Sequence, residues 1–204
     1  MSKHQNNLAE RLVDAMLAHV AEHGWRGTKL EAVEERAGLS PGEAYEVCPG
    51  RAQLLNMFAR RIDLVSVADA GPVPNDFEAR YDQLLDILML RFEALNPYRM
   101  AVSQVLTDVA REPETLFGVL PQSQRSFAFL AGAAGFPSGG WQGAIFAKAL
   151  SVVWLTTQHV WLEDESIGQS ATMAALDRNL RRAVDTLEPV LGRSFRDAQT
   201  EEKG

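Results

Sequence analysis

Apolar residues recur every three to four positions between residues 8 and 20, which is the spacing of one face of a helix. Gly24 follows this stripe and has the position of a helix stop. A second, shorter stripe comes next, with Thr28 and Glu31 at capping-box spacing in front of it and Gly38 behind it. We therefore expect two helices here, with Thr28 as the N-cap of the second.

The residues at 40–43, Ser-Pro-Gly-Glu, predict a third helix start. Serine is a good N-cap, and proline suits the first helical turn because an amide hydrogen there has no partner in the helix. Pro-Gly at 49–50 breaks this short helix, and a longer apolar stripe follows over residues 51–68. The segment 69–75, which contains Gly and Pro, has the composition of a linker. We expect a three-helix subdomain over residues 1–50 and a connecting helix over 51–68.

The rest of the chain carries longer stripes of helical period and no alternating strand pattern. The expected helices cover residues 76–95, 97–111, about 140–162 and about 169–191. Pro113, Pro121 and Pro137 punctuate the segment between the second and the third of these helices. The predicted fold class is all-α, with the N-terminal subdomain followed by a larger helical domain over residues 76–191 and a polar tail over 192–204.

Composition narrows the class of protein. The 204 residues are 46% apolar and 23% charged, as in an ordinary folded domain. Cys48 is the single cysteine, and residues 1–7 lack the apolar core of a secretory signal. No apolar run reaches the length of a membrane span, so we expect a cytoplasmic protein with no membrane insertion. The net charge of −7 works against nucleic-acid binding, because DNA affinity comes largely from Lys and Arg on phosphates.

A helix ending at Gly38, a turn of about four residues and a second short helix have helix-turn-helix spacing. The surrounding segment, residues 12–55, resembles the DNA-binding region of the TetR family, through AEHGW at 21–25, VEERAGLS at 33–40 and GEAY at 42–45. This resemblance implies a TetR-like regulator of transcription that binds palindromic operator DNA as a homodimer. The residues assigned to DNA are Thr28, Lys29, Ser40, Pro41, Gly42, Glu43, Tyr45 and Arg51, of which Tyr45 and Arg51 match phosphate-contacting positions.

The expected recognition helix departs from this pattern in its charge. Val47 and Cys48 replace the usual aromatic pair at its end, and Glu43 and Glu46 stand where polar or basic groups are common. Between residues 1 and 63, eight Lys and Arg face nine Asp and Glu, a net charge of −1. A glutamate accepts a hydrogen bond from cytosine, so an acidic recognition helix is compatible with DNA, but the usual basic surface is nearly absent.

A second resemblance lies near the C-terminal end. The run VWLEDES at 160–166, followed by MAALDR at 173–178 and Leu187, resembles the end of the ubiquinone-biosynthesis lipid-binding family, which shares the TetR fold. This resemblance implies an alternative: an accessory protein of quinone metabolism that binds an isoprenoid lipid and no DNA. The membrane-docking helix of that family has no counterpart in the short, polar segment 192–204.

Aromatic and aliphatic residues of the larger domain have two possible uses. An apolar effector or lipid pocket would be lined by Leu88, Phe92, Tyr98, Phe117, Phe127, Trp141 and Phe146, although any helical bundle needs such residues for its core. The last two helices have apolar faces wide enough for self-pairing, and the expected dimer residues are Trp154, Trp161, Leu176, Leu180, Val184 and Leu187. The alternative for these six is again the core of one chain.

Catalytic and metal chemistry have little support in the sequence. His19, Glu22 and His23 match an inverted zinc-protease motif, but no further ligand cluster accompanies them. Cys48 has no base partner in sequence, and the Gly-rich segment 132–143 lacks the lysine and the preceding strand of a phosphate loop. We expect no enzyme, no cofactor and no metal site.

Overall fold

The structure is a computed structural model, and it describes residues 3–192. This part of the chain is helical almost throughout and contains no strand. Its elements, in order, are α1 (Lys3–Gly27), α2 (Leu30–Ala37), α3 (Pro41–Val47), α4 (Arg51–Ser66), α5 (Phe77–Leu95), the 3-10 turn η1 (Asn96–Tyr98), α6 (Arg99–Val109), α7 (Pro113–Ala133), α8 (Gly140–Glu163), the 3-10 turn η2 (Ile167–Gln169) and α9 (Ser170–Leu191). The all-α prediction is confirmed.

The described residues form two compact units, and each unit is assembled from two segments. The first unit contains residues 3–61 and 95–122, and the second contains residues 62–94 and 123–192. Helices α4 and α7 contribute residues to both units. The predicted linker at 69–75 is irregular and lies inside the second unit.

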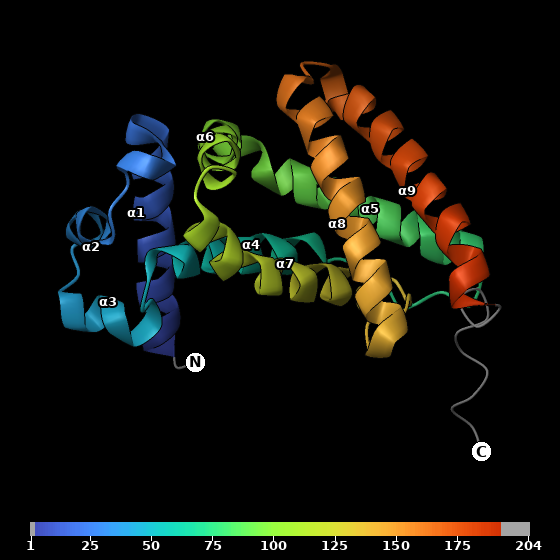
Figure 1. The fold of residues 1–204 in the computed structure, drawn as a ribbon, viewed down its shortest axis with the longest axis horizontal. Coiled ribbons are helices and arrows are strands. Elements are labelled where there is room, and N and C mark those ends of the chain that lie inside the picture. Colours follow the sequence, from blue (N-terminus) through green and yellow to red (C-terminus); the bar gives the residue numbers. More distant parts are fainter. Residues whose placement is uncertain (1–2, 193–204) are drawn as a thin grey trace. The chain divides into compact units, whose positions relative to one another are not determined.

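In the first unit, α1 packs against α2, α3 and α6 (Figure 1). Helix α1 buries the apolar stripe that was predicted between residues 8 and 20. Burial of this face against the neighbouring helices stabilises α1. The fully buried side chains at the centre of this unit are Leu12, Met16, Val20, Trp25, Val33, Ala44 and Leu54.

The end of α1 corrects one prediction. Gly24 has φ 71° and interrupts the helix, as expected from its position after the apolar stripe. Thr28, however, is not the N-cap of α2: Lys29 occupies that position and makes no side-chain cap bond. The Thr28 hydroxyl instead donates to the carbonyl of Gly24 over 2.7 Å, because the interrupted helix leaves carbonyls unpaired next to it.

In the second unit, α8 and α9 lie side by side as an antiparallel pair (Figure 1). Their contact with α5 includes the Phe92 ring stacked on Trp154, with centroids 4.0 Å apart, and the Tyr81 hydroxyl bonded to Asp177 over 2.8 Å. The buried apolar side chains of this core include Leu84, Leu88, Phe92, Phe127, Leu130, Phe136, Phe146, Leu150, Trp154, Trp161, Leu176 and Leu180.

Two prolines behave differently from the prediction. The helix expected from Pro97 starts as the 3-10 turn η1, and α6 proper begins at Arg99. Pro121 lies inside α7 and does not end it. Its ring removes the amide hydrogen that would bond to the Phe117 carbonyl, and both residues are exposed.

The predicted polar tail lies outside the described residues from position 193 onward. Within the described range, no helix combines the length and the apolar character that crossing a membrane requires.

Candidate nucleic-acid interface

The turn between α2 and α3 is fixed by backbone and side-chain hydrogen bonds. Gly38 has φ 64° and lies at the end of α2, where its amide and the next amide donate to Glu35 and Glu34. From α1, one guanidinium nitrogen of Arg11 donates to the carbonyls of Ala37 (2.7 Å) and Gly38 (3.0 Å). These hydrogen bonds hold the turn in one conformation, and they therefore fix where α3 starts relative to α2.

Helix α3 begins with Ser40 as its N-cap, as the sequence predicts, and Glu43 completes a capping box that was not predicted. The Ser40 hydroxyl accepts from the amide of Glu43, and the Glu43 carboxylate accepts from the amide (2.9 Å) and hydroxyl (2.7 Å) of Ser40. These hydrogen bonds lower the pKa of Glu43 below its ordinary value. The negative charge of Glu43 therefore stabilises the start of α3, because it lies beside the first-turn amides, where a carboxylate is favourable.

The outward side of α3 carries most of the residues assigned to DNA. Pro41, Gly42, Tyr45 and Glu46 are exposed, with Tyr45 71% accessible, while Ala44 turns into the core. Lys29 is exposed at the start of α2, and Thr28 is fully buried, so its hydroxyl has no surface to offer a phosphate.

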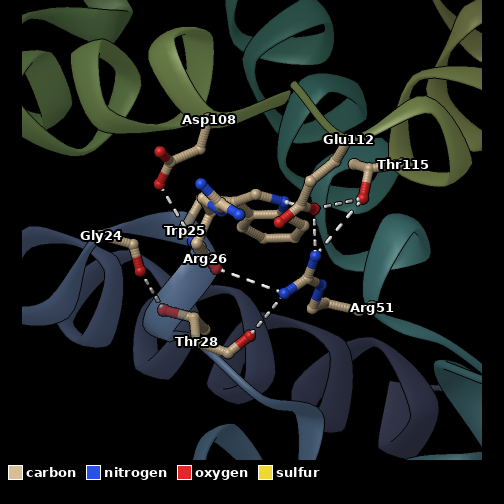
Figure 2. Close-up of polar contacts among 8 residues, drawn as sticks. All are labelled: Gly24, Trp25, Arg26, Thr28, Arg51, Asp108, Glu112 and Thr115. Atoms are coloured by element: carbon tan, nitrogen blue, oxygen red, sulfur yellow. Dashed lines mark hydrogen bonds and ion pairs between the residues drawn. The ribbon is translucent and has the colours of Figure 1, made fainter. Parts of the chain in front are cut away.

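Arg51 is held inside the first unit (Figure 2). One guanidinium nitrogen donates to the carbonyls of Trp25 and Thr28, and the other bonds to the Glu112 carboxylate. The guanidinium lies over the Trp25 ring, 4.6 Å from its centroid. Its side chain is only 28% exposed.

The Glu112 carboxylate is the centre of that network. It also accepts from the Trp25 indole N–H over 3.1 Å and from the Thr115 hydroxyl over 2.9 Å. The backbone N–H of Arg26 adds a bond to Asp108 nearby over 3.0 Å (Figure 2). No local pattern indicated Glu112, because it lies 61 positions from Arg51, between two helices.

Two more arginines of this unit are neutralised by local carboxylates. Arg36 makes a two-pronged pair with Glu22, with bonds of 2.6 and 2.7 Å, and Arg61 bonds to Glu10 and Asp14. Six exposed cations of this unit take part in no ion pair among the residues described: Lys3, Arg11, Arg26, Lys29, Arg60 and Arg111. The surface around α3 is thus less basic than the residue count implies.

The residues of the inverted zinc-protease motif are used in other contacts. The His19 and His23 rings stack with centroids 4.3 Å apart, and their δ nitrogens contact the Thr28 hydroxyl and the His19 carbonyl. Glu22 faces Arg36. Cys48 is buried, which raises the pKa of its thiol, and its S–H donates to the Gly50 carbonyl.

The structure separates the seven residues proposed for an effector pocket. Leu88, Phe92, Phe127 and Phe146 are buried together in the second unit, whereas Trp141 is 59% exposed there. Tyr98 and Phe117 belong to the first unit, where Tyr98 packs edge-on against Phe58 and Phe117 is 74% exposed. A shallow depression on α9 is lined by charged and polar residues, Arg178, Arg181, Arg182, Asp185 and Thr186.

The six residues expected at a dimer interface face inward in this chain. Trp154, Trp161, Leu176, Leu180 and Val184 are buried, and Leu187 is partly buried. The apolar side chains that α8 presents to solvent are different: Trp141, Val152 (61% exposed) and Leu155 (53% exposed). Helical periodicity identified α8 as apolar on more than one side but did not tell which side faces the core.

The VWLEDES run has a structural explanation. The Asp164 carboxylate accepts from the amide and hydroxyl of Ser166 and from the amide (2.7 Å) and hydroxyl of Thr172. Gln169, the residue before α9, has φ 54°, and its side chain does not cap the helix. Asp164, five positions earlier in the chain, caps α9 instead by accepting from the Thr172 amide. These bonds, first those from Ser166, lower the pKa of Asp164 far below its ordinary range.

A search of solved structures finds the TetR transcriptional regulator from Nitrosomonas europaea, which is 20% identical in sequence, with a TM-score of 0.65. The match covers 86% of this chain and 97% of that one. No protein-family model matches the sequence. A search of the curated proteins gives no match either. The structural likeness establishes that this chain has a TetR-like fold.

Proposed function

We propose that the chain is a DNA-binding regulator of transcription whose helix-turn-helix lies over residues 1–50. A connecting helix over 51–68 joins it to an effector-binding and dimerisation part over 76–191. The observation that carries the proposal is the presentation of α3. The turn before it is fixed by Arg11, and its first turn and Tyr45 project into solvent. A tyrosine hydroxyl is a group that positions a DNA backbone.

A binding titration tests this proposal. Duplex DNA from the region upstream of the chain's own gene is labelled, and its anisotropy is followed at low salt, with a scrambled duplex for comparison. We expect tighter binding to the upstream duplex and a loss of about tenfold in Tyr45→Ala, from one lost phosphate contact. Met100→Ala removes a similarly exposed side chain (67%) from the same unit and is the control. Equal, weak binding to both duplexes contradicts the proposal.

Self-association is the second element of the proposal. Over the 24 residues of α8 the charged side chains are Lys148 and Glu163, and Val152 and Leu155 are exposed one turn apart. A second copy packed on this face would bury them and bring two α3 helices to one duplex. Leu155→Glu is expected to shift the mass measured by light scattering from dimer to monomer. Leu64→Glu, equally exposed at 52% on α4, leaves it unchanged. A monomeric parent protein contradicts this element.

One observation favours a second function, a carrier of an apolar ligand that does not bind DNA. Glu46 is exposed on α3 without an ionic partner among the described residues, and Arg51 is bound to Glu112 instead of facing outward. Mass spectrometry of organic extracts from the purified protein discriminates between the two functions. A co-purifying isoprenoid or acyl lipid together with absent operator binding supports the carrier, and specific operator binding by lipid-free protein excludes it.

A further inference from the structure

Arg91 lies in the core of the second unit, on α5, and forms an ion pair with Asp63 at the end of α4. The two side chains are 9% and 5% exposed, and Nε of Arg91 is 3.1 Å from Oδ1 of Asp63. One terminal nitrogen of the guanidinium, Nη2, donates to the Ser126 hydroxyl over 3.2 Å. The guanidinium lies 4.4 Å from the Trp154 ring centroid and 4.9 Å from that of Phe127.

This pair leaves hydrogen-bonding capacity unused. The Arg91 Nη1 nitrogen is buried and has no acceptor among residues 3–192, and Nε and the Asp63 Oδ1 oxygen attract each other without hydrogen-bond geometry. Gln124, one helical turn before Phe127 on α7, has a buried Oε1 oxygen that also finds no donor within this range. Because each such group is costly to bury, and buried ion pairs are seldom more stabilising than apolar packing, a purely structural role explains Arg91 poorly.

The charge of this site defines what it would accept. Asp63 already neutralises Arg91, so a second anion would place an uncompensated negative charge in the core. A neutral oxygen acceptor has no such penalty and satisfies the free Nη1 donor. The surrounding rings, Phe92, Phe127 and Trp154, already stack on or tilt against one another, so a flat aromatic ligand exchanges one ring contact for another.

We propose that Arg91 is the polar anchor of a ligand site in the second unit that takes a flat, apolar molecule with a neutral carbonyl-type oxygen. This inference rests on the proposed function only for its assumption that the second unit binds an effector. The site is closed in this structure, and the ligand enters by displacing core side chains from the Arg91 guanidinium. The unsatisfied Arg91 and Asp63 groups lower the cost of that opening.

Three probes of nearly the same shape test the proposed chemistry by isothermal titration calorimetry on the full chain. They are 2-acetylnaphthalene, which carries a neutral carbonyl, 2-isopropylnaphthalene, which carries no acceptor, and 2-naphthoate, which carries an anion. We expect the ketone to bind about tenfold more tightly than either of the other probes, which corresponds to one satisfied buried donor. Equal affinities for the ketone and the hydrocarbon would overturn the proposal that Arg91 anchors the ligand. The Arg91 Nη1 nitrogen would then be expected to donate to a buried water molecule.

Two variants distinguish the anchor from general packing. In Arg91→Met the preference for ketone over hydrocarbon disappears, while Arg125→Met, an exposed arginine of α7, keeps it. In Asp63→Asn the size is unchanged but the neutralising charge is lost, so the preference inverts and 2-naphthoate binds about tenfold more tightly than the ketone. Because the second variant predicts a gain, it remains informative if Arg91→Met fails to fold. An unchanged order of affinities in Asp63→Asn overturns the charge argument.

The outcome is separable from that of the DNA experiment, because the probe titration uses protein alone. Ketone selectivity without operator binding leaves the ligand site in place and removes the regulator. Operator binding without ketone selectivity removes the site and leaves the regulator.

Discussion

Two arginines lie over tryptophan rings in the two units of the chain. Arg51 lies 4.6 Å from the Trp25 ring centroid, and Arg91 lies 4.4 Å from that of Trp154. Each also pairs with one acidic residue, Glu112 or Asp63. Both terminal nitrogens of Arg51 donate hydrogen bonds, whereas Nη1 and Nε of Arg91 find no acceptor with hydrogen-bond geometry in the described part of the chain.

This difference in hydrogen bonding indicates that Arg51 belongs to a stabilising network, whereas Arg91 has donors left for a further acceptor. A buried polar network is favourable when every member is satisfied, and a half-satisfied one is less favourable than an apolar core. By this criterion, Arg51 joins α4 to the end of α1 and to the segment before α7, and Arg91 is available to a ligand. The comparison makes opposite predictions for the same kind of substitution in the two units.

The largest effect is expected from replacing the Arg51 network by apolar residues. The double variant Arg51→Met with Glu112→Leu leaves the Trp25 indole N–H and the Thr28 carbonyl without these partners, while the Trp25 carbonyl keeps the Thr28 amide. We therefore expect a loss of about 3 kcal/mol in the free energy of unfolding. Urea denaturation followed by circular dichroism measures it. The control is Arg60→Met with Glu114→Leu, two exposed positions on α4 and in the first turn of α7, with a change below about 0.5 kcal/mol. An unchanged free energy of unfolding in the Arg51 double variant would show that the completeness of hydrogen bonding does not distinguish the Arg51 site from the Arg91 site.

The Asp164 carboxylate, whose hydrogen bonds are complete, lies in the second unit. It tests whether the difference in stability between the Arg51 and Arg91 sites comes from hydrogen bonding or from the unit in which each site lies. Asp164→Ala removes four hydrogen bonds at the start of α9 and is expected to cost about 2 kcal/mol at pH 7. Urea denaturation of Glu165→Ala, at the exposed neighbouring position, gives the reference.

The pH dependence of the Asp164 effect has a defined sign. The pKa of Asp164 is lower in the folded chain than in the unfolded one, so its contribution is fully present above the unfolded value of about 4. It declines as the pH falls from there through the folded pKa. The gap in stability between the parent chain and Asp164→Ala should therefore stay constant from pH 7 to about pH 5 and narrow below about pH 4. A gap that widens on acidification would contradict the assignment of the charged form.

Local patterns predicted the helices other than α7, together with the start of α3, and they failed where a contact joins distant residues. Ser40 was predicted as the N-cap of α3 because a cap acts on amides only a few positions away. The match of Arg51 to a phosphate-contacting position gave no indication of Glu112, its partner 61 residues away. Thr28 had the right spacing for a cap, yet its hydroxyl turned back to Gly24 because the break in α1 left a nearer acceptor.

The second unit shows the same limit in another form. Periodicity identified the apolar side chains of α8 and α9 but assigned Trp154 and Leu180 to a dimer surface, whereas both face the core. Helix α8 is apolar on several sides, so no polar face fixes its orientation, whereas α9 has one apolar face, and the core of this chain takes it. Arg91 stands beside Phe92 in the apolar stripe of α5, and this position indicates that a charge enters this core.

Replacing the Arg91 pair by apolar residues is expected to have a smaller effect of opposite sign. The double variant Asp63→Leu with Arg91→Met removes groups that are buried without complete hydrogen bonding, so the free energy of unfolding should rise by about 1 kcal/mol. Each single variant should be destabilised, because it leaves one buried charge unpaired. A loss in the double variant as large as in the Arg51 variant would mean that Arg91 is as well satisfied as Arg51.

The smallest effect is expected from the pair between Arg36 and Glu22, which is satisfied but exposed. Its two hydrogen bonds of 2.6 and 2.7 Å lower the pKa of Glu22, yet the side chains are 38% and 50% exposed. A double-mutant cycle with Arg36→Met and Glu22→Gln should give a coupling energy close to zero that falls further when salt is added, because solvent and ions screen the pair. A coupling comparable with that of Arg51 and Glu112, measured by the same denaturation, would show that hydrogen-bond geometry alone sets the value of an arginine pair. A coupling near zero would show that burial is also required, which is the condition that Arg51 and Arg91 share.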